Sequence, residues 1–159
     1  MKIIYSILTV LLFTAHLSYG FSATEASESE PYNRWLKNRF EEQHQKLIPI
    51  VAVADMFFAC NQNSENAKQY AVDYLVREMD KEVLAEKLQS CLGDSSLKSD
   101  EAINFGLSGC FHEQLASLPE EEKAQKMKLV KQAISSLSRE ERQKSLTQCV
   151  TDQAIKYLK

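Results

Sequence analysis

The sequence brings a thiol, an imidazole and a carboxylate together at one point, Cys110-Phe111-His112-Glu113. Such a group can act as a nucleophilic Cys–His pair or contribute to a metal site, and both chemistries need a free thiolate. A zinc site needs three or four protein ligands, but beyond residue 20 the only other histidine is His44. Residues one and two apart on a helix also point in different directions. We therefore expect Cys110 to be a disulfide cysteine beside an exposed His112, with no catalytic residue, metal or cofactor here.

Asp55 is a second candidate, because it interrupts the most apolar stretch of the chain, residues 50 to 60. A buried carboxyl has a raised pKa and can serve as a general acid. Buried Asp without a partner is rare, however, so we expect Asp55 to face outwards at the edge of its helix. An enzyme of unknown type would rest on Asp55, Cys110 and His112 alone.

All four cysteines follow residue 20, namely Cys60, Cys91, Cys110 and Cys149. An even number in an exported chain favours two disulfides. Helices that are separated by one intervening helix run parallel in an up-and-down bundle, so cysteines near their matching ends lie side by side. A Cys91–Cys110 bond fits worse, because Cys110 lies about 15 Å along its helix and bonded cysteines have Cα atoms within about 7 Å. The order of helices predicts Cys60–Cys91 and Cys110–Cys149.

Two of these cysteines lie in a repeated pattern, Met79–Asp94 and Leu137–Asp152. Each copy has a large apolar residue, a helix-capping Asp or Ser, a base and a Glu. A Leu three residues before the Cys and an Asp three residues after it complete the copy. Each copy predicts a capped amphipathic helix with a cysteine on its apolar face. Together with this disulfide pairing, the repeat is compatible with two successive three-helix units after an N-terminal helix. Each unit would be clipped from its first helix to its third.

Apolar residues recur at helical spacing throughout, and no useful stretch alternates with period two. We expect an all-α, compact, disulfide-clipped bundle of about seven helices. Pro31 starts the first, and Pro49 breaks or kinks it and begins a second, most buried helix. The later helices are expected to start at Ser64, Asp80, Ser99 or Asp100, Ser117-Leu118-Pro119-Glu120, and Ser138. Gly106 and Gly109 indicate that a neighbouring helix packs close to the backbone.

Residues 1–20 have a basic start, an apolar run and small residues at Ser18 and Gly20, which predicts a cleaved secretory signal peptide. The apolar run is too short to span a membrane. Residues 21–30 are small, polar and acidic, which predicts a disordered lead-in, and residues 31–159 form a single helical domain. The chain is therefore expected to be exported, to the periplasm or the extracellular space. The lack of an Asn-x-Ser/Thr site favours the periplasm.

Aromatic residues are concentrated in the first half of the domain: Tyr32, Trp35, Phe40, Phe57, Phe58, Tyr70 and Tyr74. We expect Tyr32, Trp35 and Phe40 to dock the first helix onto the core; the alternative is a groove or anchor for a ligand or partner. The net charge of −3 suggests no nucleic acid or anionic membrane. The expected function is non-catalytic binding of a protein partner, as an inhibitor, immunity factor or chaperone. The alternative is a carrier of a small apolar ligand.

Overall fold

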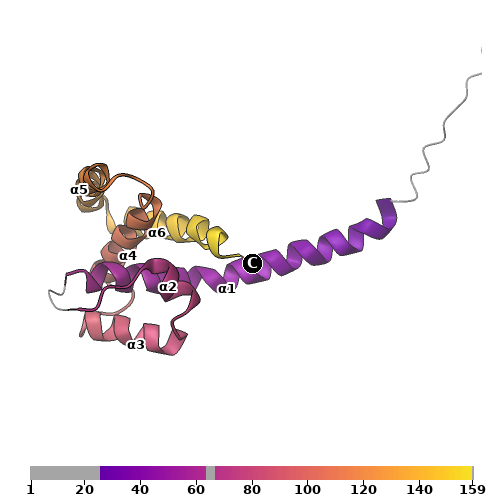
Figure 1. The fold of residues 1–159 in the computed structure, drawn as a ribbon, viewed down its shortest axis with the longest axis horizontal. Helices are drawn as coiled ribbons and strands as arrows, with labels where there is room; N and C mark the ends of the chain where they lie inside the picture. The colour runs from indigo at the N-terminus through magenta and orange to yellow at the C-terminus, as the bar shows by residue number, and fades with distance from the viewer. Residues whose placement is uncertain (1–25, 64–66, 159) are drawn as a thin grey trace, which may run out of the picture.

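The computed structural model describes residues 26–63 and 67–158, with side chains from residue 30 onwards. These residues form helices and no strand, as predicted (Figure 1). The elements are α1 (Ala26–Asn61), α2 (Val72–Arg77), α3 (Lys81–Leu92), α4 (Asp100–Gln114), α5 (Glu120–Ser136), α6 (Arg139–Ala154) and the 3-10 helix η1 (Ile155–Tyr157). The predicted signal peptide, the first part of the lead-in and the capping residue Ser64 lie outside the described residues. The remaining lead-in residues, 26–30, are helical rather than disordered.

The predicted break at Pro49 is wrong, because α1 continues through it as one helix of 36 residues. Proline removes one backbone hydrogen bond and crowds the carbonyl four residues earlier. Both Pro49 and Gln45 are exposed, so the freed carbonyl can bond to water. The helix beyond Pro49 is held by tertiary packing, since Val51, Ala54 and Phe57 are buried. One continuous helix replaces two predicted ones, which leaves six α-helices among the described residues instead of about seven.

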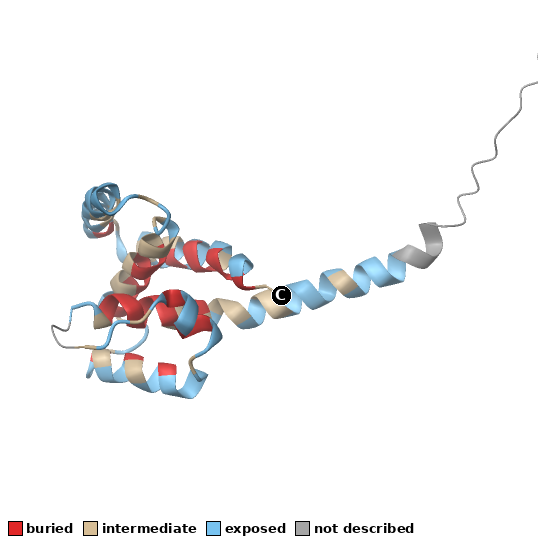
Figure 2. Cartoon of the chain, viewed as in Figure 1, coloured by how far each residue is buried: buried red, intermediate tan, exposed pale blue. Residues whose placement is uncertain are grey.

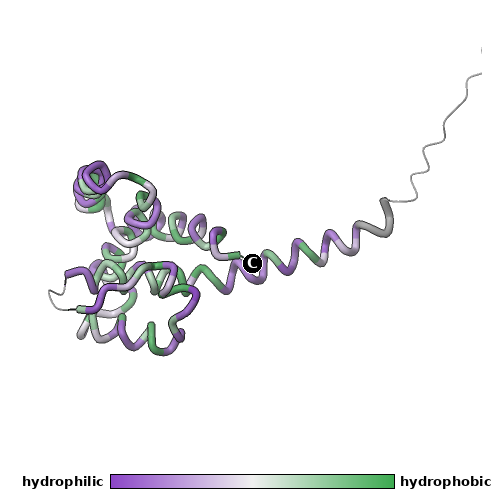
Figure 3. Tube along the Cα trace, viewed as in Figure 1, coloured by the Kyte–Doolittle hydropathy of each residue, from purple (hydrophilic) through white to green (hydrophobic). Residues whose placement is uncertain are grey.

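The two ends of α1 have different surroundings (Figure 2). From Val51 to Cys60 the helix lies in the core and packs against α3, α4 and α6, as expected for the most buried helix. Residues 30–46, which we call the arm, contain no buried residue and extend away from the bundle. Hydrophobic and hydrophilic residues are interspersed along the arm (Figure 3). The chain is therefore a bundle with a projecting helix.

Helices α1 and α4 approach each other closely. A Cβ atom added to Gly109 would lie 2.2 Å from the backbone oxygen of Asp55. At Gly106 the nearest atom would be a side-chain atom of Leu146, at 2.9 Å. The close approach predicted from these two glycines is confirmed, and at Gly109 the obstacle is backbone that cannot move aside.

Both predicted disulfides are present. The Cα atoms of Cys60 and Cys91 are 6.2 Å apart, and those of Cys110 and Cys149 are 6.3 Å apart. The first bond joins α1 to α3 and the second joins α4 to α6. Each bond therefore clips the helices on either side of one intervening helix. In the chain-entropy model, loops of this length contribute on the order of 4 kcal/mol each.

The capping predictions are confirmed at both copies of the repeat. Asp80 accepts hydrogen bonds from the backbone of Glu82 and Val83 at the start of α3. Ser138 forms a capping box with Glu141 at the start of α6. The predicted cap at Ser117 is wrong, because that residue lies in a turn closed by Leu118 N–H donating to the Leu115 carbonyl. Pro119 occupies the N-cap position of α5 and makes no side-chain cap.

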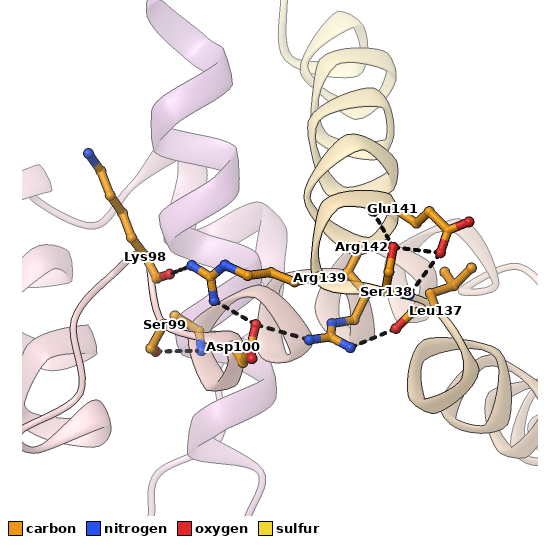
Figure 4. Close-up of polar contacts among 9 residues, drawn as sticks. Lys98, Ser99, Asp100, Leu137, Ser138, Arg139, Glu141 and Arg142 are labelled. Carbon is orange, nitrogen blue, oxygen red and sulfur yellow. Dashed lines mark hydrogen bonds and ion pairs between the residues drawn. The ribbon is translucent and has the colours of Figure 1, made fainter.

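The start of α6 is tied to the start of α4 by an ionic network (Figure 4). Arg139 and Arg142 donate to the same oxygen of Asp100, at 2.6 and 2.9 Å. Arg139 also donates to the backbone carbonyl of Lys98. The hydrogen bond with Arg142 contributes most to lowering the pKa of Asp100. The network aligns the two helices that the second disulfide joins further along.

The helix predicted from Ser64 to Met79 is much shorter in the structure. Only Val72–Arg77 is helical, and residues 67–71 have no regular structure. The side chain of Asn61 donates to the backbone carbonyl of Lys68, so this segment is held along the end of α1. The face expected to be apolar, which included Ala71, Tyr74 and Leu75, is only partly right: Leu75 is buried, whereas Ala71 and Tyr74 are exposed and the buried neighbours are Val72 and Val76.

Gly109→Ala should destabilise the protein, whereas Gly106→Ala should have little effect. The first change forces the α1 and α4 backbones apart and should cost about 1–3 kcal/mol or more of unfolding free energy. The second meets a flexible Leu146 side chain and regains about 1 kcal/mol of helix propensity. Denaturant unfolding of both variants measures the difference. Equal stability of the two would contradict a backbone contact at Gly109.

Candidate functional site

The arm exposes three large aromatic side chains. Tyr32 is 60% exposed, Trp35 56% and Phe40 44%. The expectation that they dock the first helix onto the core is therefore wrong. The reason is the continuity of α1 through Pro49, which carries the arm away from the bundle instead of letting it fold back.

The aromatic residues of the arm share one side of the helix. Tyr32, Leu36 and Phe40 recur at a spacing of four, and Trp35 lies next to them. The rings of Tyr32 and Trp35 stack with their centroids 6.0 Å apart. Arg39 places its guanidinium 5.8 Å from the Trp35 ring, a cation–π arrangement. Together these side chains form an exposed apolar strip bordered by a positive charge.

The middle of the arm is basic, although residues 30–46 as a whole carry four bases and three acids. Arg34, Lys37 and Arg39 are the only charged residues between residues 31 and 40. No ion pair in the described part of the chain includes any of them. The overall net charge of −3 therefore hides a local positive surface, which the sequence analysis did not single out. In the sequence, these bases alternate with Tyr32, Trp35 and Phe40. That alternation is the pattern from which the positive segment could have been predicted.

The root of the arm is fixed to the bundle. His44 Nε2 donates to the backbone carbonyl of Thr151, near the end of α6, at 2.8 Å. This carbonyl belongs to the last turn of the helix, where carbonyls have no partner within the helix. The direction in which the arm leaves the bundle is therefore set by a specific contact between α1 and α6.

The thiol chemistry considered at Cys110 is not available in this structure. The sulfur of Cys110 is bonded to that of Cys149, and the chain has no free cysteine. His112 is half-buried rather than exposed as predicted, and its ring packs on Phe58 with centroids 4.6 Å apart. Burial, and secondarily the charge of Lys123, lowers the pKa of His112, so the imidazole is neutral near pH 7. Among residues 26–63 and 67–158, no three His, Cys, Asp or Glu side chains gather as metal ligands would.

Asp55 has no exposed surface, so the prediction that it faces outwards is wrong. It lies on α1 where α4 and α6 cover the helix, and Gln153 Nε2 donates to its Oδ1 at 3.1 Å. Asp55 Oδ2 and Gln153 Oε1 have no hydrogen-bond partner. Burial, above all, raises the pKa of Asp55 well above its usual value, and the charge of Glu113 adds to this. A neutral carboxyl removes the cost of an unpaired buried charge.

Two further ionisable groups lie around this pair. Burial raises the pKa of Tyr157 to about 12, and Glu113 contributes to that change. Burial also raises the pKa of Glu113 itself. Arg77 lies 5.0 Å from the Tyr157 ring. Because Asp55 has no surface that a substrate could touch, we assign the Asp55–Gln153 pair to the packing of α1 against α6.

Comparison of the chain with protein-family models, with curated proteins and with solved structures finds no match. In the part of the chain that the structure describes, no helix combines the length and the apolar character that crossing a membrane requires.

Asp55→Asn should remove a pH-dependent loss of stability. Below the unfolded pKa, about 3.9 for Asp, Asp55 is neutral in both states. As the pH rises further, the unfolded chain ionises while folded Asp55 stays protonated, so stability falls until the folded pKa is passed. Each tenfold difference in proton affinity contributes about 1.4 kcal/mol. The Asn variant should therefore gain stability relative to the wild type as the pH rises.

Denaturant unfolding between about pH 4 and about pH 8 measures this difference. Asp94→Asn, at an exposed carboxylate, is the matched control and should follow the wild-type profile. An Asp55→Asn variant whose stability runs parallel to the wild type at every pH would show that Asp55 is ionised in the folded state.

Proposed function

We propose that this chain is an exported, non-catalytic helical binding protein that docks a protein partner through its arm. The observation that carries the proposal is the exposure of Tyr32, Trp35 and Phe40 on a helix that projects from the bundle. Large aromatic side chains at this level of exposure contribute nothing to the core. They are available to bury apolar surface against another molecule.

The residue types of the arm support this proposal. Tryptophan, tyrosine and arginine are the residues that most often dominate binding energy in protein interfaces. An amphipathic helix commonly binds by laying its apolar side in a groove, with anchors spaced three and four apart. Tyr32, Trp35, Leu36 and Phe40 have this spacing. The adjacent bases favour a partner with acidic residues around that groove, because complementary charge raises association rates and specificity.

The construction of the bundle supports the same function. The continuity of α1 and the fixed root at His44 hold the arm in one direction before binding. Preorganisation reduces the entropy that association costs. Disulfides of this kind persist in oxidising compartments, which supports export to the periplasm or the extracellular space. Inhibitors, immunity factors and chaperones are the partner-binding roles that fit such a scaffold.

Trp35→Ala should leave folding intact and weaken partner binding. The exposed ring contributes little to the core, so the unfolding free energy should change by less than about 0.5 kcal/mol. Loss of an aromatic anchor should weaken binding by about 2 kcal/mol or more. Thermal unfolding measures the first effect. Quantitative capture from the exported protein fraction of the source, with wild-type and variant baits, measures the second.

Glu41→Ala is the matched control, because Glu41 is exposed on the same arm and lies away from the aromatic strip at 100° per residue. A partner held by the wild type and by Glu41→Ala, but lost with Trp35→Ala, would support the proposal. Equal capture of the same partner by the wild type and by Trp35→Ala would contradict the proposal. A concentration-dependent dimer that Trp35→Ala abolishes would instead identify a second copy of the chain as the occupant of the arm.

A further inference from the structure

A separate groove lies between α4, α5 and the end of α1, with a volume of about 490 Å³. One wall is a polar stripe on α4, formed by Asn104, Ser108 and His112 at a spacing of four residues. The facing wall on α5 carries Lys123, Met127 and Lys131 at the same spacing. Pockets of this volume bind small molecules. No residue of the arm lines it.

The groove also has an apolar part to its lining. Phe58 from α1, Phe105 from α4, and Met127 and Ile134 from α5 contribute to its lining. Only Ile134 of α5 is buried in the core. The helix therefore stands off from the rest of the bundle and leaves the space open. A ligand that occupied the groove would cover apolar surface on three helices.

The two ends of the groove differ in charge. At the His112 end, Glu120 and Lys123 are one helical turn apart, and their charges act in opposite directions on the pKa of His112. That imidazole is neutral near pH 7 because of its burial. Two turns further along α5, Lys131 belongs to none of the ion pairs of the described structure. The positive charge of the groove is therefore balanced at one end and unbalanced at the other.

Asn104 adds a polar group to the lining of the groove. Asn104 on α4 and Lys131 on α5 both line the groove, each about two helical turns from the His112 end. The side-chain oxygen of Asn104 is buried and has no hydrogen-bond partner. The Lys131 ammonium matches a carboxylate, and the Asn104 oxygen, which can only accept, matches a hydroxyl or N–H group of the same ligand.

We propose that this groove binds a small organic anion: a carboxylate on an apolar, preferably aromatic, body. The carboxylate binds Lys131, the Asn104 oxygen accepts a hydrogen bond from a hydroxyl or N–H group of the ligand, and the body packs on Phe58, Phe105 and Met127. Ser108 and the neutral His112 accommodate a polar substituent at the opposite end. This site is independent of the protein partner proposed for the arm, so either can fail without the other.

The test uses 1-naphthaleneacetate and its uncharged counterpart 1-naphthaleneethanol, which share one ring system. Calorimetry on the oxidised protein should show that the acetate binds about tenfold or more tightly than the alcohol, as expected for a charge-assisted hydrogen bond. Lys131→Met, which keeps the length of the side chain, should abolish that preference. Lys128→Met is the control, since Lys128 is exposed on the same helix and does not line the groove.

Nuclear Overhauser contacts between the naphthyl protons and the methyl groups of Met127 and Ile134 should locate the bound probe. Both lysines are exposed, so unchanged melting temperatures are expected for both variants. Equal affinity of the two probes would overturn the proposal. So would equal effects of the Lys131 and Lys128 changes, or a bound probe without contacts to Met127 and Ile134.

Discussion

The contact of Gly109 with the backbone of Asp55 determines how the rest of the bundle is built. With no side chain between them, α4 lies directly on α1, and the neighbouring Cys110 is fully buried. The bond from Cys110 to Cys149 then brings α6 against the same part of α1. Gln153, one turn beyond Cys149, reaches Asp55 as a result. The burial of the Asp55 carboxyl is therefore a consequence of how α4 and α6 pack on α1.

The Asp55–Gln153 pair restricts the register between α1 and α6. Apolar side chains can slide past one another with modest loss, because apolar burial is not directional. A buried polar group without its partner costs about 1–3 kcal/mol. Sliding α6 by one residue would remove Gln153 from Asp55 and impose this cost. Together with Asp100 between Arg139 and Arg142 at the other end of α6, the pair helps to fix the helix at two points.

The features predicted correctly from the sequence are those that neighbouring residues or simple helix order determine. The caps at Asp80 and Ser138 depend on residues two or three positions away, and the disulfide pairing follows from the order of the helices. The features missed depend on distant parts of the chain. Pro49 stays helical because the segment after it is packed in the core. Asp55 is buried because α6, almost one hundred residues later, supplies a partner. The apolar residues after Pro49 did predict burial, but not that one helix would continue through the proline, and nothing near Asp55 in the sequence indicates its partner.

Each proposed binding surface includes a segment that contributes little to the core. The arm contains no buried residue, and α5 contains only Ile134. The disulfides connect α1 to α3 and α4 to α6, so neither bond attaches to α5 or to the arm. Elements with few buried contacts open most readily and tolerate the most change. The clipped core can therefore keep its geometry while Trp35 on the arm and Lys131 on α5 serve different ligands. Substitutions on these two helices can alter binding without loss of the fold.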